Sequence, residues 1–169
     1  IKIFLKYLIK TQDKNSSGFF VIGHASVLIK LGPHFILVDP QYSKRASPFS
    51  FVGPRRVRPP AIPFDQLPHI DFVLISHNHY DHLDISTLQR LKEKSDPLIL
   101  IGLGHKNLLK KNGFSKFREL DWWQSHKKRD LEISFVPARH FSSRGLFDQN
   151  KALWGGFYLN YKLKEKVFF

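Results

Sequence analysis

The sequence predicts an α/β fold built on a mixed β-sheet. Short apolar runs of strand length alternate along the chain with segments of helix length. Glycine-containing turns join some of these runs as hairpins, so antiparallel strands accompany the parallel ones that helical connections imply. With 169 residues, 42% of them hydrophobic and 24% charged, the chain can bury a substantial core and is not disordered.

Three strands are expected near the start of the chain. Residues 18–23 form the first, and the apolar runs 27–31 and 35–38 form the next two. The Gly32-Pro33 pair between the last two runs predicts a hairpin. Residues 1–17 are assigned to an N-terminal arm that precedes this first strand.

A long irregular segment follows, from residue 40 to residue 68. It contains seven of the ten prolines and shows little hydrophobic periodicity. Loops of this length in a compact domain usually serve a function. Part of the positive charge of the chain is concentrated here, on Lys44, Arg45, Arg55, Arg56 and Arg58.

Residues 71–76 are a continuous apolar run, as expected for a strand buried on both faces. Asp84 then suits the N-cap of a helix that extends to about Lys94, with leucines at 88 and 91 on its inner face. The other expected elements are a strand at 97–101, a short basic helix at 106–112, a strand at 131–136, and a final hairpin formed by 154–161 and 166–169.

The charge of the chain favours polyanionic partners. Lys and Arg number 27 against 14 Asp and Glu, so the formal net charge is +13. Such a protein attracts nucleic acid, anionic lipid or phosphorylated substrates, although a basic soluble protein without such a partner is the alternative. The chain has no cysteine, which excludes disulfides, thiolate metal sites, iron–sulfur clusters and a cysteine nucleophile.

The apolar start of the chain is too short to span a membrane and lacks a signal-peptide cleavage site. Its lysines at positions 2, 6 and 10 lie on one helical face, so it is either a membrane-surface helix or an arm packed on the domain. We favour the packed arm, and we expect a cytoplasmic protein with peripheral membrane contact as a candidate property.

The chemistry of the chain is concentrated in the pattern His77-x-His79-x-Asp81-His82, directly after the buried strand. Imidazole nitrogens and a carboxylate in six residues suit zinc or a similar divalent ion. His77 and His79 are two apart, so at a strand end they point to the same side. The turn that follows brings Asp81 and His82 to a second position, so one loop can serve two adjacent metal ions.

A metal ion needs ligands from elsewhere in the chain as well. His140 is the best distant candidate, because it also follows a strand. His24 is a candidate to support the ligands, and Asp39, at another strand end, can orient a ligand histidine through its ring N–H or cap a turn. The remaining histidines are expected in a hairpin turn (His34) or on the surface (His69, His105 and His126).

These residues, together with several flanking segments, resemble the metallo-β-lactamase superfamily. The flanking segments narrow the resemblance to the branch of N-acyl-phosphatidylethanolamine-hydrolysing phospholipase D and its bacterial relatives, from about Gly18 to the end of the chain. They are Gly23-His24-Ala25-Ser26, Val38-Asp39-Pro40, Arg45-Ala46-Ser47-Pro48, Leu120-Asp121-Trp122-Trp123, Pro137-Ala138-Arg139-His140, Gly145-Leu146-Phe147-Asp148 and Leu153-Trp154-Gly155-Gly156.

The resemblance implies an αββα sandwich with two zinc ions between its halves. His77, His79 and His140 would hold one zinc, and Asp81 and His82 would hold the other and be the catalytic candidates. The family's bridging aspartate follows a later strand, and the sequence stops at Phe169, short of such a motif. We therefore expect residues 18–169 to be the first part of a longer domain, which leaves the activity of this piece alone in question.

The resemblance further implies a zinc-dependent hydrolase acting on phosphodiester bonds of N-acyl-phosphatidylethanolamine-like phospholipids. Arg144 and the arginines of the proline-rich segment are candidates to contact the phosphate, against the alternative of solvated surface charge. Rival interpretations are a nuclease or a lactonase of the same superfamily, and a catalytically inactive fragment that binds only metal or anionic membranes. Nucleic acid is the less favoured partner, and an open sheet edge makes a homodimer a candidate state.

Overall fold

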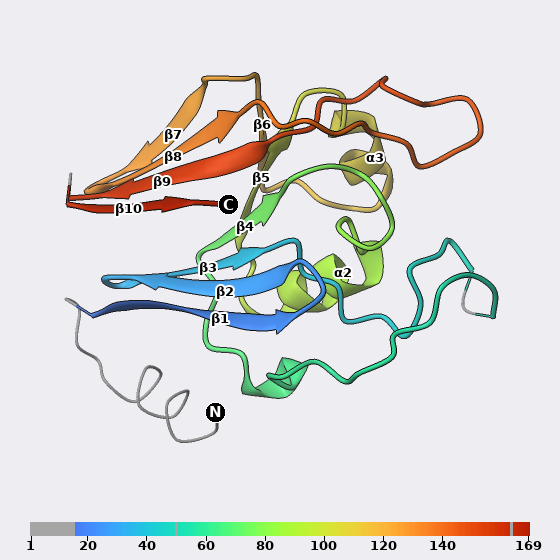
Figure 1. Ribbon diagram of the computed structural model, residues 1–169, viewed down its shortest axis with the longest axis horizontal. Coiled ribbons are helices and arrows are strands. Elements are labelled where there is room, and N and C mark those ends of the chain that lie inside the picture. The colour runs from blue at the N-terminus through green and yellow to red at the C-terminus, as the bar shows by residue number, and fades with distance from the viewer. Residues whose placement is uncertain (1–15, 50, 163) are drawn as a thin grey trace.

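The computed structural model describes residues 16–49, 51–162 and 164–169, and Figure 1 shows two β-sheets that face one another. Nearly all of the predicted N-terminal arm lies outside the described residues. The larger sheet has the order β1-β2-β3-β4-β5-β6 and the smaller the order β10-β9-β8-β7. The two α-helices of the described residues, α2 and α3, lie against the outer face of the larger sheet (Figure 1). The predicted α/β class with a mixed sheet is therefore confirmed.

The larger sheet changes from antiparallel to parallel along its width. Strands β1 (Ser17–Gly23), β2 (Ser26–Leu31) and β3 (His34–Val38) form antiparallel hairpins, as their short glycine-containing connections predict. From β3 onward the pairings are parallel, because irregular or helical segments return the chain to the same edge. These parallel strands are β4 (Phe72–Ile75), β5 (Leu98–Gly102) and β6 (Phe117–Leu120).

Both faces of the central strands are buried, as the continuous apolar run predicts. In β4, Phe72 and Leu74 belong to the core between the two sheets, whereas Val73 and Ile75 belong to the core beneath the helices. This alternation follows from the two-residue period of a strand. The loop that leaves β4 therefore starts from a fixed position.

Helix α2 (Ile85–Lys94) begins at Asp84, whose Oδ1 accepts a hydrogen bond from the backbone N–H of Thr87 at 3.2 Å. The predicted N-cap is thus confirmed. The same carboxylate accepts from the Ser43 N–H at 2.9 Å, which ties the start of the helix to the irregular segment. That segment has one 3-10 turn, η1 (Phe64–Gln66), and the second helix, α3 (Lys106–Lys111), is short as expected.

The smaller sheet is entirely antiparallel, and only part of it was predicted. Strands β8 (Leu131–Val136), β9 (Gly156–Tyr161) and β10 (Glu165–Phe168) lie at the expected positions. The edge strand β7 (Ser125–Lys128) was not foreseen, because its Ser-His-Lys-Lys sequence is polar and it pairs on one side only. The structure therefore adds a second sheet to the mixed sheet that the sequence analysis expected.

Two predictions for histidines are wrong. His105 is not on the surface: it is 1% exposed, and its Nδ1 lies 2.8 Å from the Gly102 carbonyl oxygen between β5 and α3. His34 is not in the turn but begins β3, where its ring packs edge-on against Phe72 and Tyr161. His69 is exposed and His126 is half-buried. No helix of the described ranges is long and apolar enough to cross a bilayer.

Gly155 joins the two sheets at the point where the site is built. Its N–H donates to the Ser76 carbonyl oxygen at 3.0 Å, and a Cβ placed on Gly155 would lie 2.4 Å from the Val136 carbonyl oxygen. Because the Val136 carbonyl is a backbone group that cannot move aside easily, Gly155→Ala should lower the free energy of unfolding by about 1–3 kcal/mol, measured by urea titration. Gly145→Ala is the control, because its nearest neighbour lies at 3.6 Å. Equal stability of the two variants would contradict the close approach.

Candidate metal centre

The ligand pattern lies in the loop between β4 and α2, directly at the carboxyl end of a buried strand. The loop closes as a turn, since the N–H groups of His82 and Leu83 both donate to the His79 carbonyl oxygen, at 3.1 and 2.8 Å. This turn returns His82 toward His77, and the two rings lie 4.0 Å apart between centroids. One short segment thus supplies side chains at two neighbouring positions.

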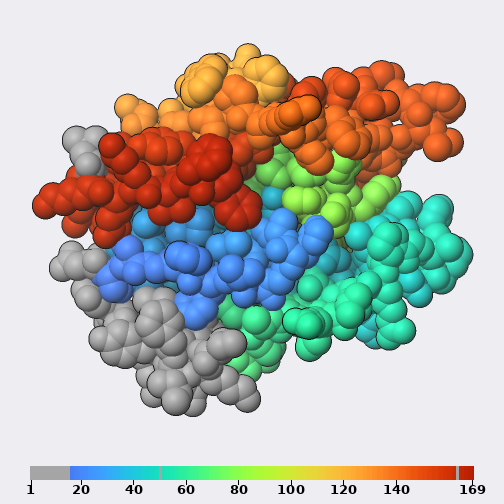
Figure 2. All heavy atoms as spheres, viewed as in Figure 1, coloured from blue at the N-terminus to red at the C-terminus, as the bar shows by residue number. Residues whose placement is uncertain are grey.

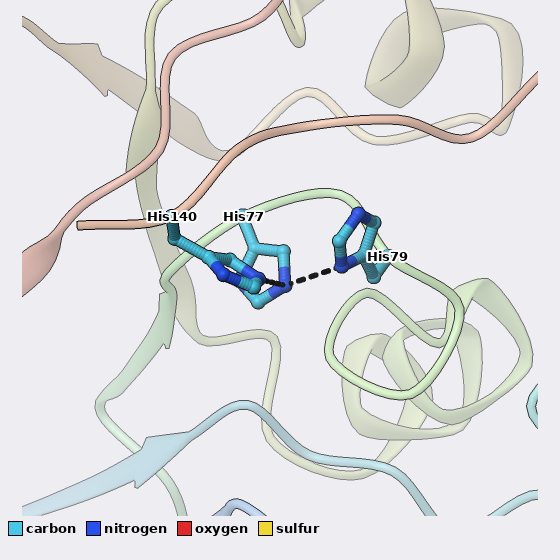
Figure 3. Close-up of side chains that lie close together, drawn as sticks. All are labelled: His77, His79 and His140. Carbon is cyan, nitrogen blue, oxygen red and sulfur yellow. Dashed lines mark hydrogen bonds between the residues drawn. The ribbon is translucent and has the colours of Figure 1, made fainter. Parts of the chain in front are cut away.

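Three histidines converge at the first position, as Figure 3 shows. His77 Nε2 lies 2.9 Å from His79 Nδ1 and 3.0 Å from His140 Nε2. His140 comes from the chain that follows β8, so the two sheets contribute to one cluster. We call His77, His79 and His140 the first cluster; their ligand nitrogens all lie within 4.8 Å of one another.

The second position gathers His24, Asp81 and His82, which we call the second cluster. Asp81 Oδ2 lies 2.8 Å from His24 Nε2 and 3.7 Å from His82 Nε2. His24 was expected only to support ligands, yet it presents a ring nitrogen to the cluster itself. It occupies the β1–β2 turn with a φ of 50°, and its partner Asp81 is 57 residues away along the chain.

The protonation states of the first cluster suit metal binding. Burial, reinforced by the neighbouring His82, His79 and His140, lowers the pKa of His77 to about 3. Burial also lowers the pKa of His79. Both rings therefore stay neutral at physiological pH and keep a lone pair for a ligand bond.

The second cluster has the opposite charge pattern. Burial alone would lower the pKa of His82, but the hydrogen bond and charge of Asp39, with Asp81 nearby, raise it overall. The pKa of Asp81 is lowered overall, because His82 and the His24 hydrogen bond outweigh the effect of burial. An ionised carboxylate therefore lies beside an imidazole that gains a proton readily.

The nitrogens of the first cluster fit a metal ion better than they fit one another. His77 Nε2 carries either one proton or one lone pair, so it cannot make a full hydrogen bond to both His79 Nδ1 and His140 Nε2. A tetrahedral zinc ion with bonds of about 2.05 Å keeps its ligand nitrogens about 3.3 Å apart. The observed separations of 2.9 and 3.0 Å need only a small expansion to reach that geometry.

A single buried carboxylate, Asp39, supports both clusters. It is 1% exposed and its Oδ2 accepts from His82 Nδ1–H at 2.8 Å, so Nε2 is the His82 atom that faces Asp81 and takes up either a proton or a metal ion. Asp39 Oδ2 also accepts from the Ser76 hydroxyl at 2.6 Å, and Ser76 Oγ lies 2.8 Å from His77 Nδ1. Since the hydroxyl proton is directed at Asp39, Ser76 accepts from His77 Nδ1–H and leaves His77 Nε2 as the ligand atom.

Arg144 holds the metal loop from outside. Its Nη1 donates to the carbonyl oxygens of Asn78 and Leu83, at 2.9 and 2.8 Å, and its guanidinium lies 4.0 Å from the centre of the Tyr80 ring. Burial lowers its pKa, although Tyr80 and two carboxylates counteract this. The structure thus gives Arg144 backbone partners in the loop, a contact that the sequence did not reveal.

A cleft of about 830 Å³ adjoins the second cluster. His24, His79 and Asp81 line part of it, and Ser143 joins them from the chain beyond β8. The rest of the wall is basic and apolar, and consists of Ile22, Gly23, Gln41, Ala46, Pro54, Arg55, Arg56, Val57, Arg58, Pro59, Ala61 and Tyr80. The proline-rich segment therefore forms a wall beside the candidate metal centre.

Comparison with known proteins gives a consistent result. The family model described as "Beta-lactamase superfamily domain" matches residues 34–169. An uncharacterized protein of Mycobacterium tuberculosis is 42% identical over 134 residues, which cover 78% of this chain and 36% of that protein. The N-acyl-phosphatidylethanolamine-hydrolyzing phospholipase D 1 of Caenorhabditis elegans is 36% identical over 154 residues, covering 84% of this chain and 43% of that protein.

A mitochondrial enzyme of the same name from Saccharomyces cerevisiae is 37% identical over 130 residues, covering 75% of this chain and 28% of the yeast protein. The chain thus spans less than half the length of the curated relatives it matches.

Two solved structures share the fold. Igni18, a metallo hydrolase from Ignicoccus hospitalis, superposes with a TM-score of 0.66 at 16% identity over 89% of this chain and 58% of that one. CmlA, a diiron beta-hydroxylase from Streptomyces venezuelae, gives a TM-score of 0.62 at 23% identity over 90% of this chain and 28% of that one.

Asp39 provides a test of the shared support. Asp39→Asn removes the charge and offers an amide N–H₂ where only acceptors fit, so His82 and Ser76 lose their fixed orientation. Zinc affinity at both clusters should fall by about 10- to 100-fold, measured by competition with a chromophoric chelator. Asp71→Asn is the matched control, because Asp71 accepts from the Phe35 N–H at 3.0 Å, away from both clusters. Unchanged affinity in Asp39→Asn would refute this role.

Acidification should remove zinc from the two clusters one after the other. Metal binding to the second cluster displaces a proton from His82, whose pKa is raised, whereas His77 in the first cluster has a pKa of about 3. As the pH falls through the raised pKa of His82, we expect zinc to leave the second cluster before it leaves the first. Isothermal titration calorimetry with zinc at a series of pH values would show this order. Loss of both ions in one step, or of the first cluster's ion first, would contradict these protonation states.

Proposed function

The chain belongs to the beta-lactamase superfamily, and we therefore propose that it is a metal-dependent hydrolase of phosphodiester bonds in phospholipids. The finer proposal is a phospholipase D-type reaction on N-acyl-phosphatidylethanolamine-like lipids with two zinc ions. The observation that carries it is the position of two ligand clusters side by side, with His24, His79 and Asp81 lining a cleft whose other walls are mainly basic and apolar.

In the proposed centre, the first cluster holds one ion through three imidazole nitrogens. The second cluster holds the other through Asp81 and His82, with His24 as an additional ligand candidate. Divalent ions at such positions supply Lewis-acid stabilisation of phosphate oxygens and lower the pKa of a coordinated water. The donor set of histidine and carboxylate suits zinc and also iron, so the choice of zinc belongs to the proposal.

The protein side chains supply orientation and charge. Through their hydrogen bonds, Asp39 orients the His82 ring and Ser76 orients the His77 ring. Asp81 is ionised and half-exposed, so its carboxylate can also accept a proton from water in the cleft.

The cleft wall fits an anionic, partly apolar substrate. Arg55 and Arg58 are exposed and lack acidic neighbours in sequence, since residues 40–64 contain no Asp or Glu. A guanidinium binds a phosphate through paired N–H groups, and these two are better placed for it than Arg144, which donates to the loop. The apolar part of the wall suits an acyl chain.

The named activity of the worm and yeast relatives supports this substrate class, at 36% and 37% identity. A nuclease is the second candidate, favoured by the formal net charge of +13. A lactonase and an inactive metal-binding piece remain the alternatives from the sequence. These candidates differ in what they cleave, so they can be separated directly.

The experiment incubates the zinc-loaded chain with N-acyl-phosphatidylethanolamine dispersed in detergent, and in parallel with RNA and with a lactone. We expect phosphatidate and N-acylethanolamine, in equal amounts, by mass spectrometry. His77→Ala should bind one zinc ion fewer than the unchanged chain. Its activity should fall by more than the roughly 10- to 100-fold that is typical when a residue hydrogen-bonded to a metal ligand is replaced. His69→Ala, an exposed histidine, is the control.

Cleavage of RNA but not lipid would replace the proposal by the nuclease. Zinc binding without turnover of lipid, RNA or a lactone would favour the inactive metal-binding piece and contradict the hydrolase.

A further inference from the structure

One projection of the molecule is a hairpin-like loop that the structure describes at residues 44–49 and 51–56, which we call the finger. Its two sides meet at an antiparallel bridge between Arg45 and Arg55. The Ala46 N–H donates to the Pro54 carbonyl oxygen at 3.0 Å, and the Arg56 N–H donates to the Lys44 carbonyl oxygen at 2.8 Å. The finger therefore holds its tip away from the sandwich.

The tip of the finger carries apolar side chains that no core covers. Phe51 is 77% exposed, and Phe49 and Val52 are each more than half exposed. The two phenylalanine rings lie 5.7 Å apart between centroids, so they form one continuous apolar tip. Large exposed aromatic groups gathered in this way mark a surface that meets another apolar phase.

A second projection, residues 141–148, carries the same kind of side chain; we call it the shoulder. Leu146 and Phe147 are almost fully exposed. The turn beneath them is held by the Asp148 carboxylate, whose Oδ1 accepts from the N–H groups of Arg144 and Gly145 at 2.9 and 2.7 Å. This shoulder is anchored to the metal loop through Arg144.

The finger and shoulder project from the same end of the molecule, on either side of a recess (Figures 1 and 2). The cleft beside the second cluster reaches both, since Arg55 of the finger and Ser143 of the shoulder line it. The apolar side chains therefore flank the entrance to the candidate metal centre.

The charge around this end is basic. Lys44, Arg55 and Arg58 are exposed on or next to the finger, in a stretch without acidic residues. Aromatic tips surrounded by arginine and lysine match an anionic bilayer, where the rings enter the headgroup region and the cations meet the phosphates. A second copy of the chain would instead bring like charges together across a symmetric contact.

We propose that the finger and shoulder form a docking surface for anionic phospholipid bilayers, which presents the cleft to lipid at the membrane surface. The inference rests on the proposed function, because it assigns the bilayer as the source of the phospholipid. It places the membrane contact on the finger, the adjacent Arg58 and the shoulder, and not on the N-terminal segment, for which a membrane-surface helix was the less favoured interpretation of the sequence.

The test is flotation of the zinc-loaded chain with vesicles of phosphatidylcholine mixed with phosphatidylglycerol, and with vesicles of phosphatidylcholine alone. We expect binding to the mixed vesicles that weakens with salt. The double variant Phe51→Ser/Phe147→Ser should bind the mixed vesicles at least about tenfold more weakly. Arg55→Gln/Arg58→Gln should weaken it by about tenfold, on the mixed vesicles only.

Matched controls come from elsewhere on the surface. Phe19 and Phe168, at 67% and 69% exposed, lie on β1 and β10, and Phe19→Ser/Phe168→Ser should bind as the unchanged chain does. Lys127→Gln/Arg129→Gln removes two charges at the β7–β8 hairpin, at the opposite end (Figure 1), and should also leave binding unchanged. Unchanged zinc content in every variant shows that the fold is retained.

The outcomes separate this inference from the proposed function. Vesicle binding that depends on Phe51 and Phe147, without lipid cleavage, supports the docking surface and contradicts the hydrolase. Cleavage of detergent-dispersed lipid without vesicle binding, or binding lost equally in the controls, overturns the docking surface. If light scattering showed that the unchanged chain self-associates and that Phe51→Ser/Phe147→Ser abolishes this without affecting vesicle binding, the face would belong to a second copy and the docking surface would be overturned.

Discussion

The hydrogen bonds of the Asp39 carboxylate are the constraint on which the rest of the site depends. This side chain lies at the end of β3, buried, with a φ of 41°. A buried carboxylate is costly unless its oxygens are all engaged, and here the Ser76 N–H, the Ser76 hydroxyl and the His82 ring supply the donors. Because Ser76 in turn orients His77, one aspartate sets the ligand nitrogen presented to each cluster.

The two-sheet arrangement explains why the centre lies where it does. The loop after β4 supplies most of the ligands, the turn after β1 supplies His24, and the chain after β8 supplies His140. The hydrogen bond from Gly155 to Ser76 fixes the smaller sheet against that loop. A shift between the sheets would therefore separate His140 from His77 and His79, and the apolar core between the sheets resists such a shift.

The metal-ligand loop and most of the strands could be predicted from the sequence, and the features that could not depend on contacts between distant parts of the chain. The pattern from His77 to His82 is local, and a strand end followed by a turn dictates which side chains face one another. The place of His24 beside Asp81 depends on a pairing of β1 with β2 at the sheet edge, which no local pattern reveals. His105 looks like a surface residue in sequence, but it is enclosed where α3 begins. The finger and shoulder are irregular, so only the structure showed their apolar tips together.

The most direct measurement of the central claim is anomalous X-ray diffraction from crystals of the zinc-loaded chain, collected on both sides of the zinc absorption edge. We expect two anomalous peaks, one enclosed by His77 Nε2, His79 Nδ1 and His140 Nε2, and the other beside Asp81 and His82 Nε2. The absence of peaks from both positions, or zinc bound only elsewhere on the surface, would contradict the two-cluster metal centre.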